Sequence, residues 1–129
     1  MAVPSDANVE LLLCDAVRQH SNGKLDLAGY FPVLEVRVDS SAPLPAAIDL
    51  TFVFVLKDGE GTFPAIFRIV DPLGEELHHH NIAKVDKTAG APHVMMLPVT
   101  RIPITRAGNF EISLEIAGER YRRQVRIFQ

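Results

Sequence analysis

The chain of 129 residues has the length of one domain and a formal net charge of −3, from 13 basic and 16 acidic side chains. That balance lacks the basic field with which most nucleic-acid-binding proteins attract phosphate. The N-terminus has an acidic residue where a signal peptide would carry a positive charge, and no apolar run reaches the roughly 18 residues of a membrane span. Since there is one cysteine, no intramolecular disulfide can form. We therefore expect one cytoplasmic domain, 1–129, with neither a membrane anchor nor a nucleic-acid partner.

The first part of the chain predicts a tail followed by a hairpin. Residues 1–8 are expected to form a flexible N-terminal tail, and the apolar run 9–17 after them is typical of a strand. Asn22-Gly23 favours a two-residue type I′ turn, because both central residues of that turn need a positive φ. The register set by this turn places Tyr30 opposite Asp15.

Two side chains of the first strand have reactive groups. Cys14 has no basic neighbour in the sequence and lies in an apolar run, so we expect a buried, reduced thiol and not a nucleophile. Asp15 is out of place in the same run. One interpretation is a buried carboxylate satisfied by backbone N–H groups or an arginine, and the alternative is a catalytic carboxylate with a shifted pKa.

The middle of the chain predicts a change of layer. Residues 39–47, a short stretch with two prolines between strands, are expected to form a crossover loop between two layers of one domain. The strand 50–56 that follows is apolar on both faces. A strand of a two-layer sandwich should present one face to water, so Val53 and Val55 need a cover. A loop of the same chain or a second copy of the protein could provide it.

A group of histidines follows the turn signal Asp71-Pro72-Leu73-Gly74. Glu76, His78 and His80 alternate, which places them on one face of a strand. Two imidazoles at this spacing can bind one Zn²⁺ or Fe²⁺, and a neighbouring strand could add another ligand from His93, His20 or Asp86. The alternative is a solvated strand start whose histidines need no metal.

The clearest pattern lies in residues 109–128, where apolar and polar residues alternate as in a hairpin with one buried face. The predicted buried side chains of its first strand are Phe110, Ile112, Leu114 and Ile116. With Gly118-Glu119 at the centre of the turn, Ile116 lies opposite Tyr121, Glu115 opposite Arg122 and Glu111 opposite Arg126. The arginine cluster of Arg120, Arg122, Arg123 and Arg126 then belongs to a charge-paired sheet face, with a phosphate-binding stripe as the alternative.

Turn signals recur at short spacing, and prolines interrupt most helical runs. A helix is possible only around residues 82–88. The fold class that follows is all-β: a single-domain antiparallel β-sandwich, immunoglobulin-like in shape, with about seven or eight strands, and a small barrel as the alternative.

Three stretches combine turns with alternating strands: residues 11–31 (LLLCDAVRQHSNGKLDLAGYF), 71–74 (DPLG) and 105–119 (TRAGNFEISLEIAGE). Together they resemble a family of small uncharacterised bacterial proteins, a domain of unknown function. The resemblance implies a bacterial, immunoglobulin-like β-sandwich without an assigned activity, so no catalytic or cofactor-binding residue is carried over from it.

The sequence leaves two functional hypotheses. The first is a non-catalytic interaction or structural module that self-associates into a homo-oligomer or binds another protein. The alternative is a small metal-binding protein or metal-dependent enzyme that holds Zn or Fe with Glu76, His78, His80 and His93. Carbohydrate binding is a third possibility, but with no Trp and 2 Tyr the chain offers few platforms for stacking sugars.

Overall fold

The computed structural model of the protein describes residues 2–39, 41 and 43–129. Over these residues it contains one short 3₁₀ helix and ten β-strands. In chain order these are η1 Asp6–Asn8, β1 Val9–Cys14, β2 Ala16–Gln19, β3 Leu25–Ala28, β4 Glu35–Arg37, β5 Ala46–Leu56, β6 Gly61–Val70, β7 Glu76–Lys87, β8 His93–Ile104, β9 Gly108–Ile116 and β10 Glu119–Phe128. No helix in the described part has the length and apolar character needed to cross a membrane.

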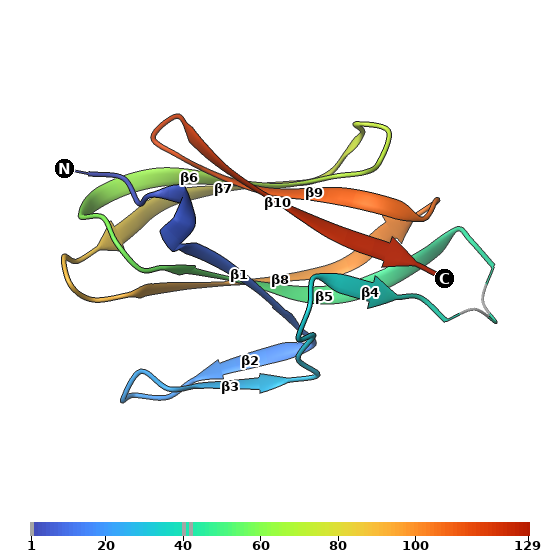
Figure 1. The fold of residues 1–129 in the computed structure, drawn as a ribbon, viewed down its shortest axis with the longest axis horizontal. Coiled ribbons are helices and arrows are strands. Elements are labelled where there is room, and N and C mark those ends of the chain that lie inside the picture. Colours follow the sequence, from blue (N-terminus) through green and yellow to red (C-terminus); the bar gives the residue numbers. More distant parts are fainter. Residues whose placement is uncertain (1, 40, 42) are drawn as a thin grey trace.

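The strands form two stacked sheets and a separate hairpin (Figure 1). One sheet has three strands in the order β1-β5-β8, and the other has five in the order β4-β10-β9-β6-β7. The hairpin β2-β3 lies outside this sandwich, against the three-stranded sheet. The structure thus confirms the all-β sandwich. Two details differ from the prediction: β4 pairs parallel to β10, and the described strands outnumber the expected seven or eight. One reason is that the run 9–17 breaks at Asp15 into β1 and β2.

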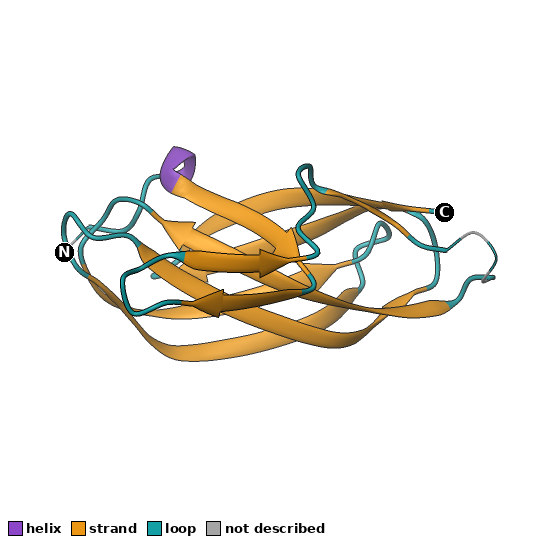
Figure 2. Ribbon diagram, turned by 90° about the horizontal axis from the view of Figure 1, so that it is seen from below, coloured by secondary structure: helices purple, strands orange, loops and turns teal. Residues whose placement is uncertain are grey.

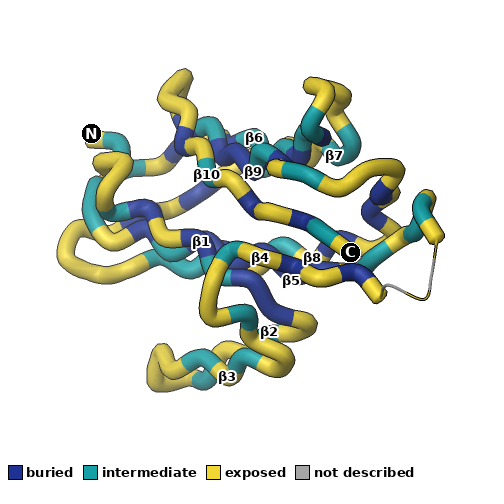
Figure 3. The backbone as a smooth tube through the Cα atoms, turned by 45° about the vertical axis from the view of Figure 1, so that its right-hand side comes forward, coloured by how far each residue is buried: buried dark blue, intermediate teal, exposed yellow. Residues whose placement is uncertain are grey.

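Phenylalanine rings fill the space between the two sheets. Phe52 and Phe54 of β5 project towards Phe67 of β6, with ring centroids 5.3 and 6.0 Å from that of Phe67. All three side chains are fully buried, and the buried residues follow the strands along the interior of the sandwich (Figure 3). Burying each such ring contributes roughly 1.5–3 kcal/mol, so this aromatic layer is a main source of stability.

The closing hairpin has the predicted faces but a different register. Ile116 pairs with Glu119, and the central turn residues are Ala117 and Gly118 with φ of 49° and 87°. Two positive φ values define a type I′ turn, which accepts Gly at its second position. The predicted Gly118-Glu119 turn is therefore wrong, and Tyr121 lies opposite Leu114. Because this shift is two residues and the side-chain period is also two, the buried set is unchanged.

The β2-β3 hairpin has a three-residue loop, so the predicted two-residue Asn-Gly turn is also wrong. His20 N donates to Lys24 O at 2.8 Å and Gly23 N donates to His20 O at 3.0 Å, with a φ of 88° at Gly23 alone in the loop. The register moves by one residue, and Asp15 lies next to Gly29 instead of Tyr30. Gly29 has a φ of 62°, a conformation that favours glycine at this position.

The turn at residues 71–74 is confirmed. Gly74 N donates to Asp71 O at 3.0 Å, and Gly74 has a positive φ of 88°. The buried carboxylate of Asp71 accepts hydrogen bonds from Leu73 N and Glu75 N at 2.9 and 2.8 Å. These bonds set the direction in which the chain enters β7. Residues 82–87, within the region where a helix was considered, belong to this strand.

The N-terminal segment, predicted to be a flexible tail, contacts both sheets. Tyr121 of β10 donates from its hydroxyl to Pro4 O at 2.5 Å. Arg123, on the same side of β10, donates to Asp6 O and Val9 O at 2.7 Å each. Since Val9 begins β1, these bonds join the two sheets along one side of the sandwich. The connection between β4 and β5, where the crossover loop is predicted, contains residues 40 and 42, which lie outside the described residues.

Candidate functional site

The side of the sandwich away from the N-terminal segment is open, because its edge strands β7 and β8 belong to different sheets. A cavity of about 170 Å³ lies between these two edges. Its walls are two histidines and a mostly apolar set of neighbours: Phe67, His78, His80, Met96, Leu97, Pro98 and Val99. Since an apolar cavity of about 150 Å³ can hold benzene, this one has room for a ring or a branched aliphatic side chain.

His78 is the more enclosed histidine of the cavity. It is half-buried and packs edge-on against Phe67, with ring centroids 5.6 Å apart. Burial lowers the pKa of His78, and the like charges of His80 and His79 lower it further. His78 is therefore a neutral imidazole at pH 7, whereas His80 is exposed at the mouth of the cavity.

Glu76 does not share a face with these two histidines. Ile69 of β6 pairs with His78, while the next residue, Val70, pairs with Glu76, so Leu77 is an extra residue in a β-bulge. One extra residue reverses the alternation and sends Glu76 to the outer face of the sheet. The prediction of a common face for Glu76, His78 and His80 holds for the histidines and is wrong for Glu76.

His93 is the first residue of β8 and pairs with Leu56 of β5. It is not among the residues that line the cavity. It is half-buried, and burial lowers its pKa, partly offset by the charge of Asp86 and reinforced by that of Lys87. The structure therefore does not bring Glu76, His78, His80 and His93 together. Within the described residues, no group of three or more His, Cys, Asp or Glu side chains is placed to hold a metal ion.

The two shifted histidines make stability depend on pH. Since the pKa values of His78 and His93 lie below the ordinary value of about 6.5, the unfolded chain takes up protons first as the pH falls. We expect the free energy of unfolding to be highest above about pH 6.5 and to decrease as the pH falls below that value. Urea denaturation between pH 7.5 and 5 measures this slope.

The double substitution His78→Gln with His93→Gln should flatten the slope over this range. Hydrogen bonds from Ser5 lower the pKa of Asp58, so the protonation of Asp58 affects stability only at more acidic pH. Keeping the measurements above pH 5 therefore separates the histidines from Asp58. A slope that is unchanged in the double variant would show that other groups control the pH dependence.

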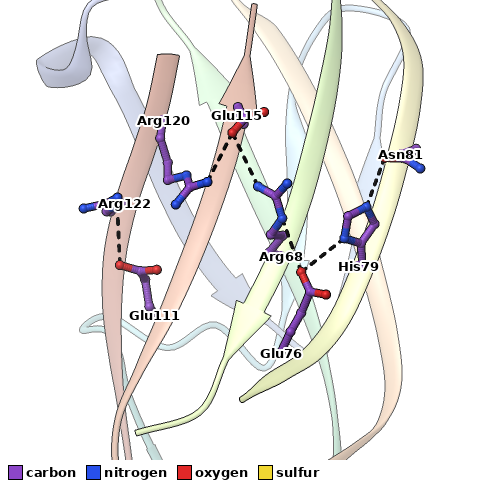
Figure 4. Close-up of polar contacts among 8 residues, drawn as sticks. All are labelled: Arg68, Glu76, His79, Asn81, Glu111, Glu115, Arg120 and Arg122. Carbon is purple, nitrogen blue, oxygen red and sulfur yellow. Dashed lines mark hydrogen bonds and ion pairs between the residues drawn. The ribbon is translucent and has the colours of Figure 1, made fainter. Parts of the chain in front are cut away.

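The outer face of the five-stranded sheet carries a chain of ion pairs across four strands (Figure 4). Arg120 Nη2 lies 3.3 Å from Glu115 Oε1, and Arg68 Nη1 approaches the same oxygen at 3.5 Å. Arg68 Nε contacts Glu76 Oε1 at 3.2 Å, and His79 Nδ1 lies 3.1 Å from that oxygen. Arg68, with 20% of its side chain exposed, joins the two halves of this network.

The C-terminal arginine cluster is charge-paired, although the partners differ from those predicted. The shifted register moves Arg122 from Glu115 to Glu111, at 3.6 Å. The complete set of pairs is Arg120–Glu115, Arg122–Glu111, Arg123–Asp6 and Arg126–Glu35. Each exposed pair contributes little to stability, about 0–1 kcal/mol. The pairs of Arg120, Arg122 and Arg126 neutralise the outer face, whereas Arg123 pairs with Asp6 on the side of Tyr121.

The two reactive residues of the first strand differ in their exposure. Asp15 is exposed in the bend between β1 and β2, so the expectation of a buried carboxylate is wrong. Cys14 is fully buried as expected, with Sγ 3.9 Å from Thr51 O. Burial, with a smaller contribution from the charge of Asp15, raises the pKa of the Cys14 thiol, which is protonated at neutral pH.

The outer face of the three-stranded sheet is apolar. The outward side chains of β1, β5 and β8 include Glu10 and Thr51 and a larger apolar set. We call this set the apolar face: Leu12, Val53, Val55, Val94, Met96 and Pro98. Val53 lies opposite Leu12 on one side and Met96 on the other, and it is fully buried within the single chain. Met96 is 39% exposed, and Val55 is partly exposed.

The β2-β3 hairpin overhangs the apolar face (Figure 2). Between them lies a groove of about 450 Å³, lined mainly by apolar groups: Asp15, Ala16, Val17, Thr51, Met96 and Pro98. The sequence did not indicate this groove. The break at Asp15 that separates the hairpin from β1 was not predicted, and the continuous apolar run containing Met96 gives no alternation to show which side chains face outward.

Comparison with known proteins places the chain in a family without assigning an activity. No curated protein matches it. The model of a family of unknown function, DUF6941, matches residues 10–126. Because this match spans most of the chain, the protein belongs to DUF6941, a family of unknown function.

Proposed function

We propose that this protein is a non-catalytic interaction module that self-associates through the apolar face of its three-stranded sheet. The proposal includes a bacterial origin and an immunoglobulin-like topology, which the resemblance of residues 11–31, 71–74 and 105–119 supports. It also includes a cytoplasmic location, supported by the single buried thiol of Cys14, since reduced thiols are typical of that compartment.

The proposal rests on the contrast between the outer faces of the five-stranded and the three-stranded sheet. On the five-stranded sheet, ion pairs among arginine and glutamate side chains cover the strands. On the three-stranded sheet, aliphatic and thioether side chains take their place, and Met96 is 39% exposed. An antiparallel sheet with a free outer face normally presents polar side chains to water. A contiguous apolar patch indicates a contact surface.

A second copy of the chain is the occupant that fits the charges of this face. A two-fold contact sets a surface against itself, so any net charge on it would be repelled. The apolar face has no ionised residue at its centre. At one end Glu10 and Lys57 pair with each other at 3.1 Å, and at the other end the exposed Asp15 borders the groove. The centre of the face can therefore meet a second copy of itself without like charges in contact.

The molecular mass in solution tests the proposal. We expect wild-type protein at high micromolar concentration to be an oligomer, and Met96→Lys to halve its mass. A lysine at this half-exposed position can extend to water in the free subunit, so the fold is retained, but it would be desolvated in the contact. The control Leu73→Lys changes a side chain that is 71% exposed in the turn after β6, and it should leave the mass unchanged.

Two outcomes would contradict the proposal. One is a wild-type protein that is monomeric at high micromolar concentration. The other is near-stoichiometric zinc or iron in untagged protein, lost together with thermal stability on changing His78 and His80 to Ala. That result would favour the metal-binding alternative, which now depends on the two cavity histidines without Glu76 and His93.

A further inference from the structure

In the described part of the chain, β7 is the longest edge strand without proline, and it is open to another strand. Edge strands expose unpaired N–H and C=O groups, and proteins protect them with proline, bulges, short length or a cover. β8 contains Pro98 and Pro103, and β4 has three residues. The start of β10 contacts the N-terminal segment. The free side of β1 accepts hydrogen bonds from Arg123 at Val9 O and from Phe31 N at Leu13 O. β7 has 12 residues and no proline.

The regular part of β7 is centred on His80. One bulge lies at Leu77, and a second irregularity lies between Ile82 and Val85. The stretch between them, residues 78–82, pairs with β6 without interruption. Bulges twist an edge away from a new partner, so this central stretch is the part of β7 that another strand can join.

The side chains of β7 complement each other about this centre. If two antiparallel copies of β7 cross at His80, His79 lies opposite Asn81 of the second copy. Glu76 and Lys84 of the two copies flank this paired stretch at each end, just beyond the bulges. His78 then faces Ile82 of the second copy on the inner side. Pairs of opposite charge stabilise such a register, whereas like charges would disfavour it. The two-fold symmetry repeats each pair.

We propose that β7 pairs antiparallel with β7 of a second copy, across a two-fold axis at His80, and joins the two five-stranded sheets into one. The inference rests on the proposed self-association and adds a second contact to that of the apolar face. The cavity supports it, because the side chain of Ile82 of the second copy lies at the mouth beside His78. An opening lined by Phe67, Leu97 and Val99 thereby gains an apolar cover.

Cysteine cross-linking tests the register directly. Residue 80 is opposite itself in this pairing, with Cα atoms about 4.5–5.5 Å apart, which is within the range of a disulfide. His80→Cys should form a disulfide-linked dimer on mild oxidation, since Cys14 is buried and does not compete. The matched control is Ala83→Cys on the same strand, whose two copies would be roughly 20 Å apart, six residues of strand. Equal cross-linking at both positions, or none at His80→Cys, would overturn the proposal.

Charge reversal gives a second measurement. Lys84→Glu places carboxylates near each other at both ends of the pairing and should halve the mass of the assembly. Lys24→Glu, an exposed lysine of the β2-β3 hairpin, makes the same change in net charge and should not. Adding Glu76→Gln to Lys84→Glu removes the like-charge contact without placing a second cation beside Arg68, and it should restore the mass. A mass that Lys84→Glu leaves unchanged would contradict the pairing.

The two contacts can fail separately. If Met96→Lys leaves the mass unchanged while His80→Cys cross-links and Ala83→Cys does not, the apolar face is not the contact but the β7 pairing stands. If Met96→Lys halves the mass and no disulfide forms at His80→Cys, the apolar-face contact stands and the β7 pairing is wrong. If both contacts hold, the Met96→Lys variant still cross-links through His80→Cys.

Discussion

Replacing Val53 by Asp is expected to destabilise the folded state by about 3–5 kcal/mol, a large share of the roughly 5–15 kcal/mol typical of a domain. Val53 is fully buried between Leu12 and Met96, within the single chain. An aspartate side chain is too short to reach water past these neighbours, and it has no cationic partner in the register. Urea denaturation of the variant and the wild type measures the difference.

The pH dependence of this loss separates its causes. Because burial raises the pKa of a carboxyl group, the introduced Asp binds protons more readily in the folded state than in the unfolded one. The difference from wild type should therefore shrink as the pH falls towards 4. Leu73→Asp, at a side chain that is 71% exposed and outside the apolar face, is the control and should cost less than about 1 kcal/mol. A folded, monomeric Val53→Asp variant would mean that a second copy, and not the same chain, covers Val53.

Replacing Leu114 by Ala is expected to lower the free energy of unfolding by about 2–5 kcal/mol. Leu114 is fully buried in the centre of β9, opposite Phe67 of β6 and Tyr121 of β10. Removing its branched end takes apolar atoms out of the core and leaves a cavity that strands on both sides prevent from collapsing. Chemical denaturation gives the value.

Ser113→Ala is the matched control, one residue away on the other face. Ser113 is also buried, contrary to the exposed position expected for a polar-face residue, because it lies opposite Arg68 and Arg122. It is small, however, so its replacement leaves no sizeable cavity and should change the free energy by about 0.5 kcal/mol or less. Equal losses at the two positions would contradict the assignment of the faces.

The closing hairpin shows what alternation can and cannot predict. The buried side chains of β9 follow from the sequence, since the period of two allows only two ways to assign the faces. The register does not follow, because Gly118 suits the first position of one turn type and the second of another. Only the assembled sheet, in which Leu114 lies opposite Tyr121, selects the second position. The ion-pair partners of the arginine cluster depend on that choice.

The positions of the candidate site residues depended more on tertiary structure than the faces of the closing hairpin did. Spacing alone correctly placed His78 and His80 on one face, but it placed Glu76 with them because a bulge at Leu77 has no sequence signal of its own. The position of His93 depends on how the chain passes from β7 in one sheet to β8 in the other. That arrangement places His93 beside Asp86 and Lys87, outside the cavity that His78 lines.

The sequence by itself determined the all-β sandwich, the buried face of each clear strand and the turn at residues 71–74, because local periodicity and backbone preferences act over a few residues. The tertiary structure decided the registers, the bulges, the parallel pairing of β4 with β10 and the separation of the β2-β3 hairpin from the sandwich. These features depend on contacts between strands distant in the chain. The apolar face, the cavity between β7 and β8 and the open edge of β7 depend on the same contacts, which is why the surfaces proposed for function became visible only in the folded protein.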